Sequence, residues 1–175
     1  MEKSYKEYLK HITTFIFDVD GVFTDGTLLV TTDGEMLRKM SVKDGYALKT
    51  AIKRGYHVCI ITGGTNEGVE KRLRGLGVEH IYLGAHLKEK PLLEYLEQSG
   101  IEAKNALYMG DDMPDIPPMK LVGLPTCPQD AIPEIKEVAQ YVSHKNGGHG
   151  CVRDVIEQVL KVRGDWEGNF SAAND

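Results

Sequence analysis

The chain has 175 residues, of which 41% are hydrophobic and 27% are charged, as is usual for a single globular domain. A net charge of −5 without a block of basic residues argues against nucleic acid as a partner, and no apolar run is long enough to span a membrane. The three cysteines lack disulfide or zinc spacing and no signal-peptide pattern is visible, so a cytoplasmic location is expected.

Apolar runs of strand length alternate with segments of helical period. The predicted strands cover residues 14–18, 57–62, 80–83, 106–110, 121–124 and 140–142, and the predicted helices cover 46–54, 67–76, 90–98, 131–138 and 152–162. This alternation predicts an α/β fold with a doubly wound, mostly parallel sheet and helices on both faces, in one domain over residues 1–163. Residues 164–175 are rich in Gly, Asn, Ala and Ser, which predicts a flexible tail.

Residues 27–40 interrupt the alternation. Two short strand-like runs flank Asp33-Gly34, which is a strong hairpin signal. The exposed edges and apolar side chains of such a hairpin would be a liability on a monomer, so we expect the hairpin to mediate subunit contact.

Carboxylates follow the first predicted strand directly. Asp18 and Asp20 end an apolar run, and at a strand end both can converge on one cation. Taken alone, such a tripeptide is more often an acidic turn. A later group favours the cation site, because Asp111, Asp112 and Asp115 also follow an apolar strand and crowded like charges repel unless a cation neutralises them.

Two further segments offer groups that can bind phosphate. Thr62 and Gly63 lie between a predicted strand and a helix, where a hydroxyl and backbone N–H groups can bind a phosphoryl oxygen, although an N-cap at Thr65 or Asn66 would also account for this sequence. Lys88 and Lys90 lie in a later loop, where a lysine can neutralise a carboxylate and the phosphate it attacks, or is simply solvated. All these residues follow strands, where ligands bind in open parallel sheets.

The order of these motifs resembles the haloacid dehalogenase (HAD) superfamily of phosphohydrolases over nearly the whole chain. The matching motifs are Asp18-Val-Asp20, Thr62, Lys88 and Gly110-Asp111-Asp112-x-x-Asp115. Other segments are similar to a small capless branch of the superfamily, which includes phosphatases of 3-deoxy-D-manno-octulosonate 8-phosphate. These segments are Asp18-x-Asp20-Gly-Val-x-Thr-Asp25-Gly, Val42-Lys43-Asp44-Gly45-Tyr46, Gly110-Asp-Asp-Met-Pro-Asp-Ile-Pro and Gly147-Gly148-His149-Gly150.

The resemblance implies a role for each motif. Asp18 would be the nucleophile that forms an aspartyl-phosphate, and Asp20 the general acid and then base. Mg²⁺ would be held by the carboxylate of Asp18, the backbone carbonyl of Asp20 and Asp111. Thr62, Gly63 and Lys88 would bind the phosphoryl group, and the spacing of Lys88 fits the family better than that of Lys90. Asp112 or Asp115 would orient metal-bound water.

The resemblance also implies an assembly and a pathway. The assembly would be a homotetramer in which the hairpins pack at the interface and a neighbouring subunit helps to cover the active site. The pathway would be the supply of an outer-membrane lipopolysaccharide sugar.

The substrate is less strongly indicated than the reaction. Relatives that act on the eight-carbon sugar acid usually have arginine after the threonine-glycine pair, relatives that act on nine-carbon keto-acid phosphates tend to have glutamate, and this chain has Gly64. We expect the eight-carbon ester, with the nine-carbon ester as the alternative. Lys43, Asp44, Gly64 and Arg153 are candidates for substrate contact, although solvation, helix capping and a surface ion pair would explain Lys43, Asp44 and Arg153.

A protein of another functional class, a phospho-aspartate receiver or binding domain, is the alternative to a phosphatase. Such a domain also has a parallel sheet, clustered aspartates, Mg²⁺, a threonine and a lysine, but its adjacent acidic pair would lie on the first strand. Here the first strand carries Asp18 and Asp20, and the adjacent pair Asp111-Asp112 comes late, which favours the hydrolase.

Overall fold

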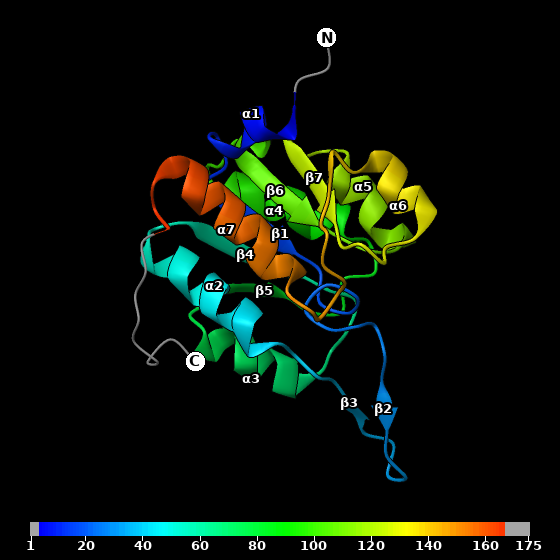
Figure 1. Cartoon of the computed structure of the whole chain (residues 1–175). Coiled ribbons are helices and arrows are strands. Elements are labelled where there is room, and N and C mark those ends of the chain that lie inside the picture. The colour runs from blue at the N-terminus through cyan, green and yellow to red at the C-terminus, as the bar shows by residue number, and fades with distance from the viewer. Residues whose placement is uncertain (1–3, 167–175) are drawn as a thin grey trace.

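The computed structural model describes residues 4–166 as a parallel sheet with helices on both faces (Figure 1). In this part of the chain the sheet has six strands in the order β5-β4-β1-β6-β7-β8, and every neighbouring pair is parallel. The strands are β1 (Thr14–Phe17), β4 (His57–Ile61), β5 (His80–Tyr82), β6 (Ala106–Met109), β7 (Leu124–Cys127) and β8 (Tyr141–Val142). The predicted α/β class is confirmed.

The central strand β1 is apolar from Phe15 to Phe17 because both of its faces are covered. All four of its residues are buried. Phe15 and Phe17 pack into one core cluster and Ile16 packs into the other, as the alternation of side chains along a strand requires. The end of β1 is therefore held firmly by packing on both sides. Asp18 is the next residue along the chain.

The helices divide between the two core clusters. On one face lie α1 (Tyr5–Leu9), α2 (Val42–Lys53), α3 (Glu67–Gly75) and α7 (Cys151–Arg163), and on the other α4 (Glu89–Ser99), α5 (Ile116–Met119) and α6 (Pro133–Val138), with 3₁₀ turns η1 (Ala103–Asn105) and η2 (Met113–Asp115). α7 packs along α2 (Figure 1). The short helices α1 and α5, of five and four residues, were not predicted because they are too short to show a helical period. α2 begins at Val42 rather than at the predicted residue 46.

The position predicted for the strand at residues 121–124 is wrong by three residues. The strand β7 spans Leu124–Cys127 and includes Pro125, which is opposite Tyr108 of β6. Proline is rare inside a sheet because it cannot donate to the ladder, so the segment that contains Pro125 lacks a typical strand pattern. The apolar residues from Leu121 onward instead belong to the turn that leads into β7, and Leu121 itself is 37% exposed.

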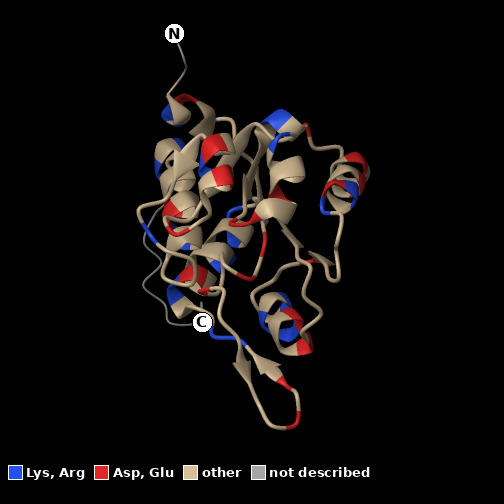
Figure 2. Cartoon of the chain, turned by 90° about the vertical axis from the view of Figure 1, so that its right-hand side faces the viewer, with Lys and Arg blue, Asp and Glu red and all other residues tan. Residues whose placement is uncertain are grey.

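The predicted hairpin is confirmed within residues 27–40. β2 (Leu29–Val30) and β3 (Met36–Leu37) pair antiparallel and project from the body of the molecule (Figure 1). Its two strands are uncharged and acidic residues lie near its tip (Figure 2). Within residues 4–166 this hairpin is the insertion between β1 and α2, and no cap domain covers the strand ends.

The end of the folded body lies later than predicted. Residues 164–166 were assigned to the tail, yet the hydroxyl of Tyr56 donates a hydrogen bond to Asp165 Oδ2 at 2.6 Å, and Trp166 packs against the core. The rest of the predicted tail, residues 167–175, lies outside the described residues. None of the helices between residues 4 and 166 has both the length and the apolar character needed to cross a membrane.

Candidate active site

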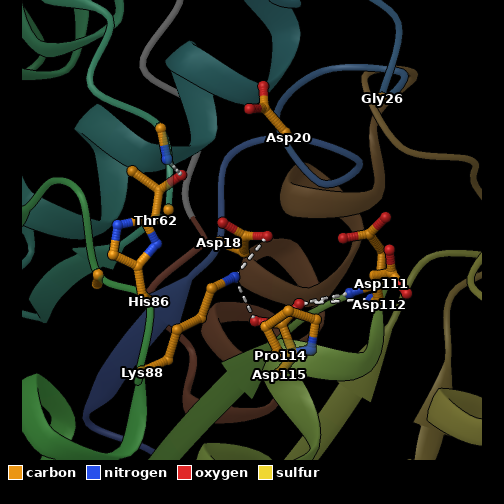
Figure 3. A pocket seen from close by; sticks show the side chains of 13 residues that line it. Asp18, Asp20, Gly26, Thr62, His86, Lys88, Asp111, Asp112, Pro114 and Asp115 are labelled. Carbon is orange, nitrogen blue, oxygen red and sulfur yellow. Dashed lines mark hydrogen bonds and ion pairs between the residues drawn. The ribbon is translucent and has the colours of Figure 1, made fainter.

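Three strands bring polar residues to the same edge of the sheet. Asp18 follows β1, Thr62 follows β4, and Asp111 follows β6 after one glycine. The chain runs outward from β1 to β4 and β5 and then returns to β6 on the other side of β1, so strand order reverses at this point, where such sheets bind ligands. A pocket of about 350 Å³ lies here (Figure 3). It is lined by Asp18, Asp20, Gly26, Thr62, Gly63, Gly64, Ala85, His86, Lys88, Asp111, Asp112, Pro114 and Asp115.

Lys88 lies between two carboxylates at the floor of the pocket (Figure 3). Its Nζ is 2.8 Å from Asp18 Oδ2 and 2.8 Å from Asp115 Oδ1, and the side chain is 5% exposed. Burial alone would lower the pKa of this ammonium, but the two carboxylates outweigh burial and raise the pKa above its usual value. Lys88 is therefore a permanent cation in the pocket, whereas the competing Lys90 is exposed on α4.

Asp115 holds the loop after β6 in place. Its side chain is fully buried, and Oδ1 accepts a hydrogen bond from the Tyr108 hydroxyl at 2.8 Å in addition to the contact with Lys88. Oδ2 accepts from the backbone N–H groups of Asp111 and Asp112 at 3.1 and 3.4 Å. Gly110 makes this possible, because a Cβ there would lie 2.3 Å from the Asp115 Cβ.

The 18–21 loop lies directly against Asp111. The N–H of Val19 donates to Asp18 Oδ1 at 2.6 Å, which fixes the direction of that carboxylate. Gly21 has a φ of +85°, and a Cβ there would lie 1.9 Å from Asp111 Oδ2. A side chain at residue 21 would therefore displace Asp111 from its place beside Asp18.

Three acidic side chains converge at this point. Asp18, Asp111 and Asp115 each offer a carboxylate oxygen, and these atoms all lie within 4.8 Å of one another. Burial, followed by repulsion from Asp115, raises the pKa of Asp18 to about 7. Burial, followed by repulsion from Asp18, raises the pKa of Asp111 to about 8.

The convergence fits a divalent cation. Carboxylates crowded in this way stay ionised at neutral pH only when a positive charge compensates them, and oxygen ligands suit Mg²⁺. Each oxygen of Asp115 already contacts two donors, whereas each oxygen of Asp18 contacts one among the described residues, so Asp18 and Asp111 offer the better ligands. The predicted metal residues Asp18 and Asp111 thus lie together. Asp115 contacts Lys88 and the Asp111 backbone and so holds their surroundings in place.

Asp20 points away from Asp18, toward the mouth of the pocket (Figure 3). It forms a two-pronged ion pair with Arg38, in which Nε lies 2.9 Å from Oδ1 and Nη2 lies 3.0 Å from Oδ2. Arg38 follows β3 at the base of the hairpin and was not predicted as a site residue. No signal in the sequence links it to Asp20, because the contact depends on how the hairpin folds back.

The loop after β4 lines the opposite wall. The Gly64 N–H donates to Thr62 Oγ1 at 3.2 Å, and Thr62 and Gly63 both line the pocket. The helix N-cap, which was the alternative explanation for this segment, is Asn66, whose Oδ1 accepts from the Val69 N–H at 3.0 Å. The capping interpretation is therefore correct for Asn66, while Thr62 and Gly63 line the pocket. His86 also lines the pocket and was not predicted, since a single loop histidine carries no distinguishing pattern.

Three of the predicted substrate contacts lie elsewhere. Asp44 is buried and accepts from the N–H of Arg153 at 2.8 Å, and burial raises the pKa of Asp44 to about 6. The Arg153 Nε lies 3.1 Å from Glu157 Oε2. Lys43 and Arg153 line a separate cavity of about 520 Å³. Among the four candidates only Gly64 lines the pocket in this part of the chain, so substrate contact by the other three remains a prediction.

Comparison with known proteins places the chain in a family. Residues 85–156 match the family model of haloacid dehalogenase-like hydrolases. A 3-deoxy-D-manno-octulosonate 8-phosphate phosphatase of Salmonella typhi is 39% identical over 155 residues, which cover 89% of this chain and 82% of that protein. The chain belongs to the haloacid dehalogenase-like hydrolases.

Solved structures of this family have the same fold as the chain. The 3-deoxy-D-manno-octulosonate 8-phosphate phosphatase from Yersinia pestis is similar with a TM-score of 0.91 and 35% identity, over 94% of this chain and 89% of that one. The corresponding Moraxella catarrhalis enzyme was solved in complex with a magnesium ion, a phosphate ion and a KDO molecule. It is similar with a TM-score of 0.89 and 31% identity, over 93% of each chain.

The carboxylate cluster predicts how stability depends on pH and metal. Asp18 and Asp111 keep their protons up to about pH 7 and 8 in the folded metal-free protein but ionise near 3.8 when unfolded. The unfolded chain then binds fewer protons between these limits, so the free energy of unfolding should fall as pH rises. We expect the melting temperature in chelator to drop by a few degrees from pH 6 to 8.5 and Mg²⁺ to reverse this drop.

Differential scanning fluorimetry with and without Mg²⁺ would measure this effect. The range above pH 6 is diagnostic because Asp44, with its pKa of about 6, contributes to the same slope mainly below that value. Asp111→Asn should flatten the slope in chelator. A metal-free protein whose melting temperature stays level or rises above pH 6 would contradict the account.

Proposed function

We propose that the protein is a Mg²⁺-dependent phosphatase that hydrolyses 3-deoxy-D-manno-octulosonate 8-phosphate to the free sugar acid and phosphate. The observation that carries the proposal is the position of Asp18, which is buried at the end of β1, fixed by the Val19 N–H, paired with Lys88 and adjacent to Asp111. The family membership and the names of the similar phosphatases support the reaction and the substrate.

In the first step the carboxylate of Asp18 attacks phosphorus, and the bond from phosphorus to the sugar oxygen breaks. Asp20, at the mouth of the pocket, gives its proton to that leaving oxygen. In the second step Asp20 takes a proton from water as the water attacks phosphorus, which breaks the bond to Asp18 and releases phosphate. At the end of the cycle Asp18 is again a carboxylate and Asp20 is again protonated.

The remaining groups balance charge and position the phosphate. When bound, Mg²⁺ offsets the repulsion between a carboxylate nucleophile and an anionic phosphate. Lys88 adds a fixed positive charge beside Asp18. The Thr62 hydroxyl and the Gly63 N–H bind phosphoryl oxygens. Asp115, rather than the exposed Asp112, orients Lys88 and the Asp111 loop, because its oxygens contact both.

Phosphate release from three esters would test the proposal. The purified protein is given the eight-carbon ester, a nine-carbon keto-acid 9-phosphate and an aryl phosphate, each with Mg²⁺ or with chelator. We expect Mg²⁺-dependent release that is fastest from the eight-carbon ester. Preference for the nine-carbon ester would overturn the substrate but keep the reaction, and no metal-dependent release from any ester would favour a receiver or binding domain.

We also propose that the chain assembles as a homotetramer through its hairpins and acts in the cytoplasm. The hairpin exposes Leu29, Val30, Met36 and Leu37 by 45–68%, and an isolated two-stranded hairpin is marginal in water, so a second copy is the expected cover. The three cysteines are buried free thiols, as is usual in a reducing compartment.

Light scattering coupled to gel filtration would measure the assembly. The double variant Leu29→Ser/Leu37→Ser changes two residues that are opposite each other in the hairpin. It should shift the mass from tetramer toward monomer, whereas Val162→Ser on α7, also exposed, should not. A wild-type protein of monomer mass would refute the assembly proposal.

A further inference from the structure

Arg38 differs from its neighbours Met36 and Leu37 in the hairpin because its side chain is largely covered. The side chain is 9% exposed, whereas the neighbouring residues Met36 and Leu37 are 49% and 45% exposed. Its guanidinium lies against Asp20 at the mouth of the pocket, with Nε and Nη2 each donating to a different oxygen of the carboxylate. Such two-pronged pairs fix the plane of the carboxylate as well as its distance.

A further hydrogen bond holds the Arg38 guanidinium in place. Its Nη1 donates to the backbone oxygen of Met36 at 2.9 Å, and the same oxygen accepts from Asn66 Nδ2 at 3.2 Å. Asn66 is the N-cap of α3, where its Oδ1 accepts from the Val69 N–H. A continuous set of contacts therefore runs from the N-terminus of α3 through the hairpin base to the carboxylate of Asp20.

Gly64 leaves room for this pair on the wall of the pocket. A Cβ at residue 64 would lie 3.5 Å from Arg38 Nη2 and 3.5 Å from Asp20 Oδ2, which are ordinary contact distances. A longer side chain would project toward the same two groups. The pocket is thus open on the side where Asp20 and Arg38 meet, and the Asp20 side chain remains 35% exposed to it.

We propose that Arg38 is a positioning residue of the reaction, which holds the carboxylate of Asp20 in the orientation needed for proton transfer at the mouth of the pocket. This inference rests on the proposed function, in which Asp20 is the general acid and base. A partly exposed aspartate can otherwise rotate freely, and proton transfer is lost when the group is displaced from hydrogen-bonding reach of the reacting oxygen. The base of the hairpin therefore contributes to the chemistry of its own subunit.

Kinetics of Arg38→Met and Arg38→Lys on the eight-carbon ester would test the proposal. We expect Arg38→Met to lower kcat by about tenfold or more, a part of the roughly 10²- to 10⁴-fold that a general acid or base supplies. KM and the Mg²⁺ concentration for half activity should change less than about threefold, because Asp18, Lys88 and Asp111 are untouched. The Arg38→Lys variant keeps the positive charge but lacks the planar pair of donors that contacts both oxygens of Asp20. Its kcat should therefore lie between those of Arg38→Met and wild type.

The matched control is Lys39→Met. It also removes one positive charge, but from the next residue, whose side chain is exposed. It should keep kcat within about twofold of wild type. An equal loss in both variants would mean that only the net charge of the hairpin matters and would overturn the proposal. Melting temperature and mass in gel filtration are measured for each variant, since a purely structural role would change these and leave kcat intact.

A double-mutant cycle tests whether Arg38 acts through Asp20. In the Asp20→Asn background, Arg38→Met should cause no further loss of single-turnover phosphate release, because the group that Arg38 positions is already inactive. A further loss as large as in the wild-type background would overturn the proposal, as would an unchanged kcat in Arg38→Met alone.

A crystal structure of Arg38→Met provides a readout that does not depend on activity. The Asp20 carboxylate should rotate or occupy more than one conformation, while Asp18 and Asp111 stay in place. An Asp20 side chain that keeps its orientation would overturn the positioning role even in an active enzyme. Absence of phosphate release from the wild-type protein would instead refute the proposed function, so the two failures are distinct.

Discussion

Replacing Asp18 with asparagine should lower phosphate release by roughly 10⁴-fold or more while the protein stays folded. The amide of asparagine has the shape of the carboxylate but cannot attack phosphorus. Folding should not suffer, because burial and repulsion from Asp115 disfavour the ionised form of Asp18 and raise its pKa to about 7. At pH 8 in chelator, the melting temperature of Asp18→Asn should equal or exceed that of wild type.

Phosphate release and a thermal melt of the same preparation would measure both effects. Asp33→Asn is the matched control, since it makes the same chemical change at the exposed tip of the hairpin. Its rate should remain at the wild-type level. An Asp18→Asn protein with wild-type turnover would show that another group is the nucleophile.

Replacing Lys88 with methionine should cause the second large effect, on activity and stability together. Lys88 is the cation between Asp18 and the fully buried Asp115. Removing one partner of a buried charge cluster leaves the others uncompensated, which costs about 3–5 kcal/mol of unfolding free energy. The loss of the positive charge beside the transferred phosphoryl group should lower kcat by roughly 10²- to 10³-fold.

Chemical denaturation in chelator and steady-state kinetics with Mg²⁺ would check the two parts. Lys90→Met is the control, because Lys90 lies two residues away in the same segment but is exposed. Its stability and rate should stay close to wild type. If Lys90→Met lost activity and Lys88→Met did not, the assignment of the pocket lysine would be wrong.

Much of the fold could be predicted because its signals are local. The central strands are buried on both faces, so β1, β4 and β6 appear in the sequence as continuous apolar runs. The residues after these runs then had to lie at one edge of the sheet, because the strands are parallel. Asp18, Thr62 and Asp111 were placed in one pocket by this reasoning.

The position of β7 shows the limit of local signals. An apolar run beginning at Leu121 favoured a strand at residues 121–124, three residues before the strand in the structure. Pairing with β6 decided the outcome, because the strand that fits the sheet places Pro125 opposite Tyr108. Pairing between strands distant in sequence depends on the whole packing and has no local pattern.

The sequence by itself determined the α/β class, the hairpin and the strand-end residues Asp18, Thr62 and Asp111 that converge on the pocket, since strand period and strand ends are properties of short segments. Only the tertiary structure decided which partners those residues have. It placed Lys88 between Asp18 and Asp115, and it paired Arg38 with Asp20 across 18 residues. Such contacts are decided by the way in which loops from different strands and the hairpin pack together at the sheet edge, and side-chain spacing within any one segment does not encode that packing.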